Sequence, residues 1–381
     1  MKLDDEMMRT VALGLALTCC LLAPVSANGA DPEADRCINE ANPDRQIRYC
    51  TDLIQAGNYS GAHAAPLFNS RGMAHDNKGQ YNEAIADFDR AIRLRPDYAE
   101  AFNNRGRAYD DLGKYQLGLA DFEAAIRINP HLPEPFYGRG NVREHFGNYD
   151  QAVIDYDEAI HLKSDFAEAF ANRAIAYFHK GNYEHAMADF GEAIRIKPDY
   201  AEAYNNRGYA YYNLGRYDRA IADFDEAIRR NPDYVRALNN RGDAYHEEGQ
   251  YDRALADYGA ALHLRPDQAR TLNAICWNLI SLGRGREALT NCDKSLGIEP
   301  NVAAVLDSRG FVHLQLGDPG AAIADFDRAL KLDARLSTSL FGRGVAKDRL
   351  GDKVGAGLDY AAARAIQKNV EAVLRRQRIL P

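Results

Sequence analysis

The sequence lacks most features that mark catalytic, metal-binding and nucleic-acid-binding proteins. Its six cysteines form no Cys-x-x-Cys pair, and it contains no His-Glu-x-x-His, no phosphate-binding glycine loop and no Gly-x-Ser-x-Gly. The ten histidines are scattered, and His145 and His179, one repeat apart, have no thiolate or clear carboxylate nearby, so we expect no metal site and no cofactor. A net charge of −8 argues against non-specific binding to nucleic acid or anionic membrane. We therefore predict no catalytic residues.

Long hydrophobic runs are also rare, and the clearest one lies near the N-terminus. The stretch VALGLALTCCLLAPVSA is too short for a comfortable membrane span, and it ends in small residues that suit signal-peptidase cleavage after Ala27. Residues 1–27 are therefore predicted to be a signal peptide, so that the protein is periplasmic or secreted and is not inserted in the membrane after cleavage.

Two details of this segment leave alternatives open. The acidic residues Asp4, Asp5 and Glu6 have the wrong charge for a signal peptide, whereas a start at Met7 or Met8 puts Arg9 ahead of the apolar run, so the true start is predicted there. A lipoprotein signal is the competing interpretation, although Cys19 and Cys20 lie inside the apolar run.

From residue 65 to residue 370 the sequence repeats every 34 residues, which gives nine copies. Each copy has a glycine after an apolar-periodic stretch, a position typical of the left-handed residue that ends a helix. These glycines are Gly79, Gly113, Gly147, Gly181, Gly215, Gly249, Gly283, Gly317 and Gly351. A second helical stretch of the type DRAIADFDEAI follows, and a proline closes most copies. Each unit is predicted to be a helix, a short turn and a second helix.

The fifth copy carries a family resemblance. Its small residue Gly208, its alanines Ala220 and Ala227, its aromatic residues and Pro232 resemble the tetratricopeptide repeat (TPR) pattern, and the match covers about four-fifths of the chain. The resemblance implies an all-α, right-handed superhelical solenoid of antiparallel helix pairs, with a concave groove lined by the first helix of each repeat. Residues 28–64 are predicted to form an N-terminal capping hairpin, and residues 371–381 to end a C-terminal capping helix whose arginines face water.

Arginine and aspartate recur together in eight copies, sixteen residues apart. The arginines are Arg71, Arg105, Arg139, Arg173, Arg207, Arg241, Arg309 and Arg343, and the aspartates are Asp87, Asp121, Asp155, Asp189, Asp223, Asp257, Asp325 and Asp359. The seventh copy has Ile275 and Asn291 instead, so both charges are lost together. Only pairing within a repeat leaves neither charge alone, which predicts salt bridges such as Arg207–Asp223 between the two helices of each hairpin. The alternative is that the seventh copy has drifted.

The remaining cysteines fall into two symmetric pairs. A mid-helix glycine such as Gly208 is predicted to allow close helix packing, and in the seventh copy this position is Cys276, while the usual aromatic position of the second helix is Cys292. Cys37 and Cys50 flank a predicted turn in the same way. In an exported protein these pairs predict two disulfides, Cys37–Cys50 and Cys276–Cys292, with buried free thiols as the alternative.

The groove implied by the family resemblance is where we expect a partner to bind. Early repeats present acidic residues there, middle repeats present Phe178, Tyr209 and Tyr212, and late repeats present Trp277, Ile280, Phe311 and Leu314. This aromatic and aliphatic cluster is a candidate anchor for a partner. Packing between adjacent first helices is the alternative.

Asparagines add a polar element to the predicted groove. In four copies the residue just before the repeated arginine is an asparagine: Asn104, Asn172, Asn206 and Asn240. This series resembles the asparagine ladder of the O-GlcNAc transferase repeat domain, in which side-chain amides hold a peptide backbone. Gly138 and Ala274 interrupt the series, and local hydrogen bonding near the helix start is the alternative. The sequence thus predicts a non-enzymatic scaffold that binds a protein or peptide in its groove, or else an accessory subunit of a cell-envelope enzyme or transport complex that docks through its outer surface.

Overall fold

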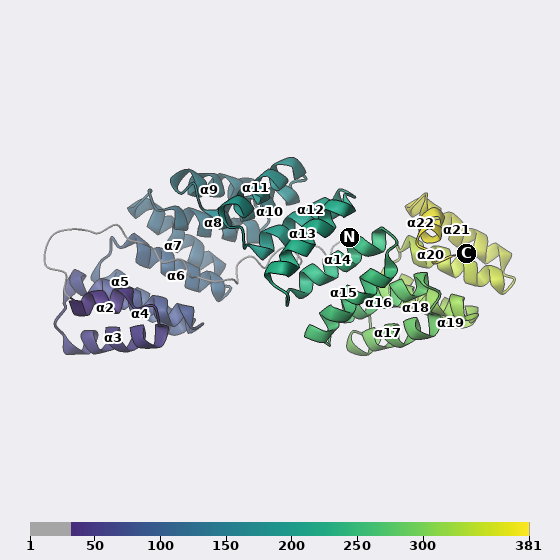
Figure 1. Cartoon of the computed structure of the whole chain (residues 1–381), viewed down its shortest axis with the longest axis horizontal. Helices are drawn as coiled ribbons and strands as arrows, with labels where there is room; N and C mark the ends of the chain where they lie inside the picture. Colours follow the sequence, from purple (N-terminus) through teal and green to yellow (C-terminus); the bar gives the residue numbers. More distant parts are fainter. Residues whose placement is uncertain (1–31, 381) are drawn as a thin grey trace. The chain divides into compact units, whose positions relative to one another are not determined.

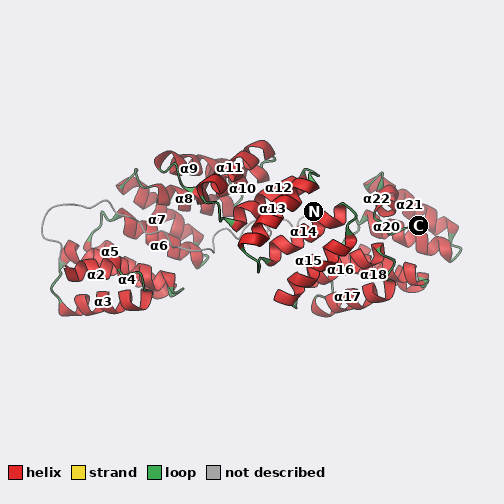
Figure 2. Ribbon diagram, viewed as in Figure 1, coloured by secondary structure: helices red, strands yellow, loops and turns green. Residues whose placement is uncertain are grey.

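The computed structural model describes residues 32–380, and these residues form helices joined by short turns, without a β-strand among them (Figures 1 and 2). The predicted signal peptide, residues 1–27, lies outside the described residues. Helices α2 (Pro32–Asn39) and α3 (Pro43–Ala56) and the 3-10 helix η1 (Gly61–Ala64) come first. Among residues 32–380, no helix combines the length and the hydrophobicity that crossing a membrane requires.

Antiparallel helix pairs follow in an unbroken series. The first helices of the pairs are α4 (Ala65–Asn77), α6 (Ala99–Asp111), α8 (Pro133–His145), α10 (Ala167–His179), α12 (Ala201–Asn213), α14 (Val235–Glu247), α16 (Ala269–Ser281), α18 (Ala303–Leu316) and α20 (Ser337–Arg349). The second helices are α5 (Tyr81–Leu94), α7 (Tyr115–Ile128), α9 (Tyr149–Leu162), α11 (Tyr183–Ile196), α13 (Tyr217–Arg230), α15 (Tyr251–Leu264), α17 (Gly285–Ile298), α19 (Pro319–Leu332) and α21 (Lys353–Ile366). The predicted fold class, an all-α solenoid of helix pairs, is confirmed.

The turn inside each pair depends on a glycine with a left-handed backbone. Gly215, for example, has φ of 68°, and the corresponding glycines from Gly79 to Gly351 all have φ between 68° and 89°. Side chains with a Cβ atom rarely adopt this conformation, so glycine ends the first helix at this position in every pair.

A second glycine holds the two helices of a pair close together. A Cβ atom added to Gly208 would lie 2.8 Å from Cε1 of Phe224, whose ring is fully buried. The ring thus occupies the space that a larger side chain on α12 would need. This contact explains why a residue with poor helix propensity lies in the middle of a first helix.

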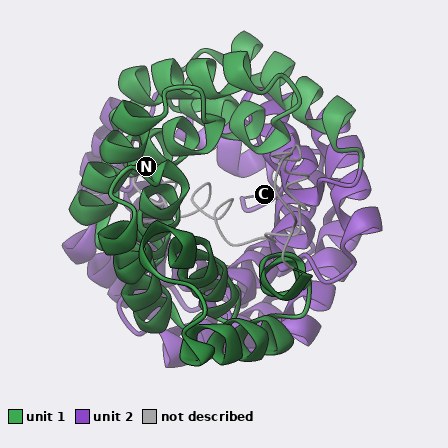
Figure 3. Ribbon diagram, turned by 90° about the vertical axis from the view of Figure 1, so that its left-hand side faces the viewer, with its two compact units in different colours: residues 1–198 green, residues 199–381 purple. Residues whose placement is uncertain are grey.

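The described helices form two compact units, which divide between residues 198 and 199 (Figure 3). In the first unit, Cys37, Cys50 and Leu53 of the N-terminal hairpin pack against Leu67 of α4. A larger hydrophobic cluster in the second unit extends from Cys276 to Leu380.

The C-terminal end of the second unit is covered by α22 (Val370–Arg376), whose Val370 and Leu374 are fully buried. The side chains of Arg375 and Arg376 are 55% and 66% exposed, so these arginines face water as expected. The helix ends at Arg376, and Ile379 and Leu380 beyond it are buried. The proposed domain limits themselves stay a prediction.

Candidate functional site

The repeated arginines form salt bridges within their own helix pairs. Arg207 donates from Nε to Oδ2 of Asp223 at 2.8 Å and from Nη2 to Oδ1 at 2.7 Å. The other pairs sixteen residues apart, from Arg71–Asp87 to Arg343–Asp359, are also bonded. The aspartates are buried, and the two-point contact with a guanidinium is a strong form of ion pair. These arginines therefore join the helices of each pair and are not exposed for a ligand.

Five of the arginines also bond to a second aspartate, which the sequence analysis did not predict. Nη1 of Arg105 donates to Oδ1 of Asp89, on the second helix of the preceding pair, at 2.5 Å. The same contact, again sixteen residues back along the chain, occurs in four more pairs: Arg173–Asp157, Arg241–Asp225, Arg309–Asp293 and Arg343–Asp327. One guanidinium thus connects three helices. The signal was present in the sequence as an aspartate two residues after the buried one.

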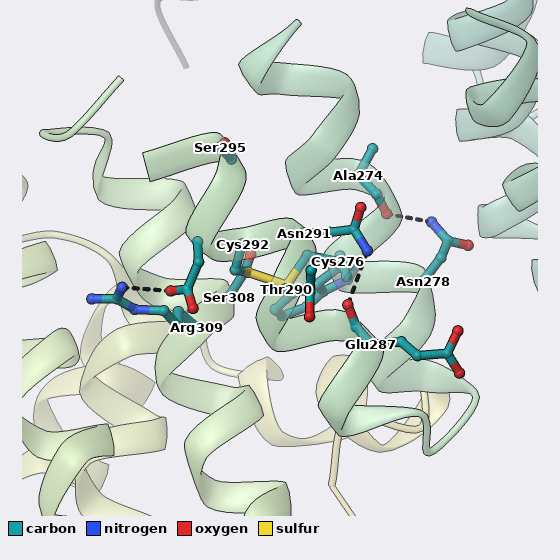
Figure 4. The surroundings of a disulfide bond; sticks show 12 residues. Ala274, Cys276, Asn278, Glu287, Thr290, Asn291, Cys292, Ser295, Ser308 and Arg309 are labelled. Atoms are coloured by element: carbon teal, nitrogen blue, oxygen red, sulfur yellow. Dashed lines mark hydrogen bonds and ion pairs between the residues drawn. A yellow bond between two sulfur atoms is a disulfide. The ribbon is translucent and has the colours of Figure 1, made fainter. Parts of the chain in front are cut away.

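The seventh pair, α16 and α17, replaces this salt bridge by a covalent bond (Figure 4). Cys276 and Cys292 are joined, with an S–S distance of 2.06 Å, at the positions where other pairs hold a glycine against an aromatic ring. Ile275 and Asn291 occupy the arginine and aspartate positions, and Gly259 occupies the position of the missed second acid. All three charges of the network are therefore absent together.

The N-terminal hairpin has the other disulfide, between Cys37 of α2 and Cys50 of α3, with an S–S distance of 2.01 Å. Both pairings are those that the sequence predicts. Disulfides form and persist mainly in oxidising compartments.

The asparagines bond to one another, both between neighbouring first helices and between adjacent residues of one helix. Nδ2 of Asn240 donates to Oδ1 of Asn205 at 3.0 Å, and Nδ2 of Asn205 donates to Oδ1 of Asn206 at 3.1 Å. Asn104 donates to Asn69 at 3.1 Å in the same way, and Asn172 donates to the hydroxyl of Tyr137 at 3.0 Å.

These contacts correct the predicted peptide ladder. Asn172, Asn206 and Asn240 are between 1% and 6% exposed, and Asn104 is partly buried. Their amides are therefore engaged in packing between repeats and are not presented to a peptide. The alternative of purely local bonding is also incomplete, because Asn240 and Asn205 are 35 residues apart.

The interruptions of this ladder leave three buried amide oxygens without a hydrogen-bond partner among the described residues. They belong to Asn103, Asn172 and Asn273. In each case the donor expected from the ladder is missing, because Gly138, Ala171 and Ser308 occupy the positions that asparagine has elsewhere. The structure thus explains each unpaired oxygen by one substitution.

The predicted apolar anchor is largely core. Ile280, Phe311 and Leu314 are between 1% and 4% exposed, and Tyr209 is 8% exposed. Phe311 packs edge-on against Phe326, with ring centroids 5.1 Å apart. These four residues are therefore withdrawn from the binding surface, because neighbouring helices cover them. Phe178, Tyr212 and Trp277 are only partly buried.

Tyr212 and Trp277 line a pocket of about 200 Å³ formed by the first helices α12, α14 and α16, together with Tyr258 of α15. Its other lining residues are Asp243, His246, Arg270, Asn273, Ala274 and Asn278. Asp243 and His246 were not among the predicted site residues, although they lie at the same repeat positions as Trp277 and Tyr212, a signal that was present in the sequence. A larger hollow of about 560 Å³ lies at the turn of residues 215–219 and is lined mainly by exposed side chains.

The pocket contains buried polar groups of unusual chemistry. His246 is 8% exposed, and its Nε2 has no hydrogen-bond partner in the described chain. Oδ1 of Asn273 is also buried and has no hydrogen-bond partner there. The Tyr258 hydroxyl donates to Oδ1 of Asp243 at 2.7 Å. Burial raises the pKa of the Asp243 carboxyl above its ordinary value, and nearby Arg270 opposes this effect. Buried polar atoms in proteins are nearly always hydrogen-bonded, so these two exceptions mark a candidate ligand site.

The acidic residues expected in the groove of the early repeats lie on α4, α6 and α8. Oδ1 of Asp76 is buried without a partner in the described chain, and Oδ2 accepts from Arg107 at 3.4 Å. Burial raises the pKa of Asp76 and of Asp110 to about 6. Within residues 32–380, no group of three or more His, Cys, Asp or Glu side chains is arranged to hold a metal ion. His145 and His179 instead stack on Tyr115 and Tyr149, with ring centroids 3.8 Å and 4.8 Å apart.

The geometry defines a helical repeat protein with a small polar and aromatic pocket on its first helices. Family models described as tetratricopeptide repeat or TPR repeat match residues 205–269 and 309–370, residues 77–113 and 176–215, and residues 99–132. The chain belongs to the tetratricopeptide repeat family, whose members generally act as protein-interaction scaffolds. A search of curated proteins gives no significant match.

Several solved structures share the fold. The chain is similar to a chain of the APC/C hetero-tetramer Cut9-Hcn1, with a TM-score of 0.57 and 18% identity over 74% of this chain and 54% of that chain. The present chain therefore spans about half the length of that relative. It is also similar to a tetratricopeptide repeat protein from Parabacteroides merdae, with a TM-score of 0.51 and 21% identity over 65% of this chain and 98% of that one. PilF of Pseudomonas aeruginosa gives a TM-score of 0.50 and 17% identity over 54% of this chain and 94% of that one. At these identities the likeness concerns the fold alone.

Proposed function

We propose that the protein is a non-enzymatic scaffold that holds a segment of a partner protein on its first helices, with the pocket between Tyr212 and Trp277 as the anchor point. The observation that carries this proposal is the combination of two partly exposed aromatic rings with two buried, unpaired polar atoms in one pocket. Concave sites with aromatic walls and a few placed polar groups are typical of binding sites. Two disulfides and the N-terminal apolar run support a periplasmic or secreted location.

The proposal can be tested by filling the pocket. Ala274 lines it and is partly exposed, so Ala274→Leu adds bulk without removing a polar group. The full chain, produced under oxidising conditions, is used to select binders from a random peptide display library. Peptides selected by the wild-type chain are expected to lose most of their binding to the Ala274→Leu variant.

The matched control is Ala120→Leu, which adds the same side chain at an exposed position of α7. This variant is expected to bind the selected peptides normally, and circular dichroism checks that both variants are folded. Equal binding of all selected peptides to wild type and to Ala274→Leu would contradict the proposal.

The alternative, an accessory subunit that docks through its outer surface, also has one specific observation in its favour. Leu350, Val354 and Leu358, four residues apart near and on α21, are 59%, 78% and 69% exposed. Val354 and Leu358 lie on one face of α21, and Leu350 lies in the turn that precedes this helix. If the double variant Val354→Ser and Leu358→Ser abolishes partner binding while Ala274→Leu does not, outer-surface docking is the better description.

A further inference from the structure

The chemistry of the pocket points to a hydrogen-bond donor as its ligand, and His246 gives the first reason. Nδ2 of Asn278 donates to the carbonyl oxygen of Ala274 at 2.9 Å, so Oδ1 of Asn278 is the atom that faces Nδ1 of His246 at 3.1 Å. An amide oxygen can only accept, and Nδ1 must therefore carry a proton. In the neutral ring, Nε2 is then an acceptor. His246, which carries this unpaired and buried acceptor, is one of the residues that line the pocket.

Asn273 and Asp243 also line the pocket, and each carries a further acceptor. Oδ1 of Asn273 is buried and has no partner in the described chain. Among the described residues, Oδ2 of Asp243 receives only a long contact of 3.4 Å from Arg270, whose side chain is 61% exposed. Arg270 thus lies at the solvent-exposed rim and holds this oxygen weakly. A ligand with several donors would satisfy all three acceptors.

The walls of the pocket favour a positive charge. Trp277 and Tyr212 both line it, and the faces of these rings attract cations, tryptophan most strongly. An anionic group would meet the Asp243 carboxylate and two acceptor atoms inside the pocket, whereas the cationic Arg270 side chain, which also lines the pocket, is 61% exposed and lies at the rim. A purely apolar group would leave Nε2 of His246 and Oδ1 of Asn273 unpaired, which costs free energy in a buried site.

We infer that the pocket binds an arginine or lysine side chain of the partner segment. The inference rests on the proposed function and adds the chemical identity of the anchor. A guanidinium offers five donors and an ammonium three, which matches three acceptors beside two aromatic rings. A volume of about 200 Å³ accommodates the end of one such side chain. The net charge of −8 also favours encounter with a basic partner.

Three short peptides test this inference directly. Acetyl-Gly-Arg-Gly-amide, the same peptide with lysine, and the same peptide with citrulline, the neutral isostere of arginine, are titrated into the full-length oxidised chain. Trp277 is the sole tryptophan of the sequence, so its fluorescence reports on the pocket itself. The arginine and lysine peptides are expected to give a saturable change, and the citrulline peptide to bind about tenfold more weakly or worse.

Matched variants test whether the basic peptides bind in this pocket. Asp243→Asn is expected to weaken binding of the arginine peptide by about tenfold, and Asn273→Ala by a smaller factor. Asn103→Ala is the control, because Asn103 has the same repeat position and the same unpaired oxygen but lies outside the pocket. It is expected to leave the affinity unchanged. Equal affinity for the citrulline and arginine peptides, or no saturable change with either basic peptide, overturns the inference.

The selected library peptides separate this inference from the proposed function. If their binding depends on Ala274 but they carry no basic residue, the scaffold proposal stands and the inference of a basic anchor fails. If their binding is unaffected by Ala274→Leu, the pocket is not the anchor point and both fail. A basic residue whose replacement by citrulline abolishes Ala274-dependent binding supports both.

Discussion

Arg207 and Asp223 lie on opposite helices of one pair, and the guanidinium of the first donates two hydrogen bonds to the carboxylate of the second. Asp223 is 6% exposed, so removing Arg207 leaves a buried carboxylate without its counter-ion. We expect Arg207→Met and Asp223→Asn each to lower the free energy of unfolding by about 2–4 kcal/mol. The double variant should lose less than the sum, with a coupling energy of about 1–3 kcal/mol.

Urea denaturation of the four proteins measures this cycle. Arg229→Met serves as the control, because within residues 32–380 Arg229 forms only an exposed ion pair with Glu226 on its own helix. It should have no measurable effect. Strict additivity of the two core substitutions would show that the repeated pairs are not coupled.

The disulfide of α16 and α17 should be replaceable by the arrangement of the other pairs. Substituting both Cys276 and Cys292 by alanine should lower the free energy of unfolding by about 3 kcal/mol under oxidising conditions, because a loop-closing crosslink is lost. The combined change Ile275→Arg, Cys276→Gly, Asn291→Asp and Cys292→Phe restores the residue types of the other pairs at these positions. We expect it to recover much of the lost stability and to make this pair insensitive to reductant. Denaturation with and without dithiothreitol distinguishes these outcomes.

The ladder asparagines should matter for stability rather than for binding. Asn240→Ala removes the donor to Oδ1 of Asn205 and leaves a buried acceptor unpaired, at an expected cost of about 1–3 kcal/mol. Asn82→Ala, at an exposed position of α5, is the matched control and should be neutral. Affinity for peptides that depend on Ala274 should not change in either variant. A large loss of peptide affinity in a folded Asn240→Ala protein would restore the ladder as a binding element.

Asp307 gives a pH-dependent prediction. It accepts from Ser339 at 2.5 Å and Thr338 at 2.9 Å, and burial raises its pKa from 3.8 to about 6. Between about pH 4 and pH 6 the folded protein therefore holds a proton that the unfolded chain has released, and stability falls as the pH rises through this window. Asn occupies the same repeat position in five other repeats, so Asp307→Asn should raise the free energy of unfolding at pH 7, by roughly 3 kcal/mol at most.

The test compares denaturation midpoints of wild type and Asp307→Asn from pH 4 to pH 7. The gap between them should widen as the pH rises and be smallest near pH 4. Asp267→Asn makes the same change of charge at an exposed position and should show no such trend. A constant gap across this range would argue against a buried, titrating Asp307.

Much of the scaffold could be predicted because equivalent positions of the nine internal copies can be compared with one another. The joint loss of Arg and Asp in the seventh copy predicted the pairing of Arg207 with Asp223, and the symmetry of Cys276 and Cys292 about a turn predicted their bond. The second acid, such as Asp89 beside Arg105, was missed because its spacing runs backwards into the previous repeat. That contact depends on how consecutive pairs stack, which a single hairpin does not encode.

The candidate site was predicted less well, for a related reason. Trp277 and Tyr212 were recognised, whereas Ile280 and Phe311 proved to be core. The exposure of a first-helix side chain depends on how the side chains of the next repeat pack against it. The sequence pattern alone does not show that packing. Asp243 and His246 were not predicted, although they share the repeat positions of Trp277 and Tyr212 and His246 is only 8% exposed.

The asparagine ladder has a consequence for the order of the repeats. Asn205 is satisfied because an asparagine stands 35 residues later, at Asn240, whereas Asn273 is unsatisfied because that place is held by Ser308. Exchanging two repeats would leave every hairpin and the overall composition unchanged, yet it would pair different amides and move the unpaired oxygens to new places. The modules are therefore not interchangeable. Among the described repeats, the order along the chain therefore determines where a buried asparagine oxygen lacks a hydrogen-bond donor.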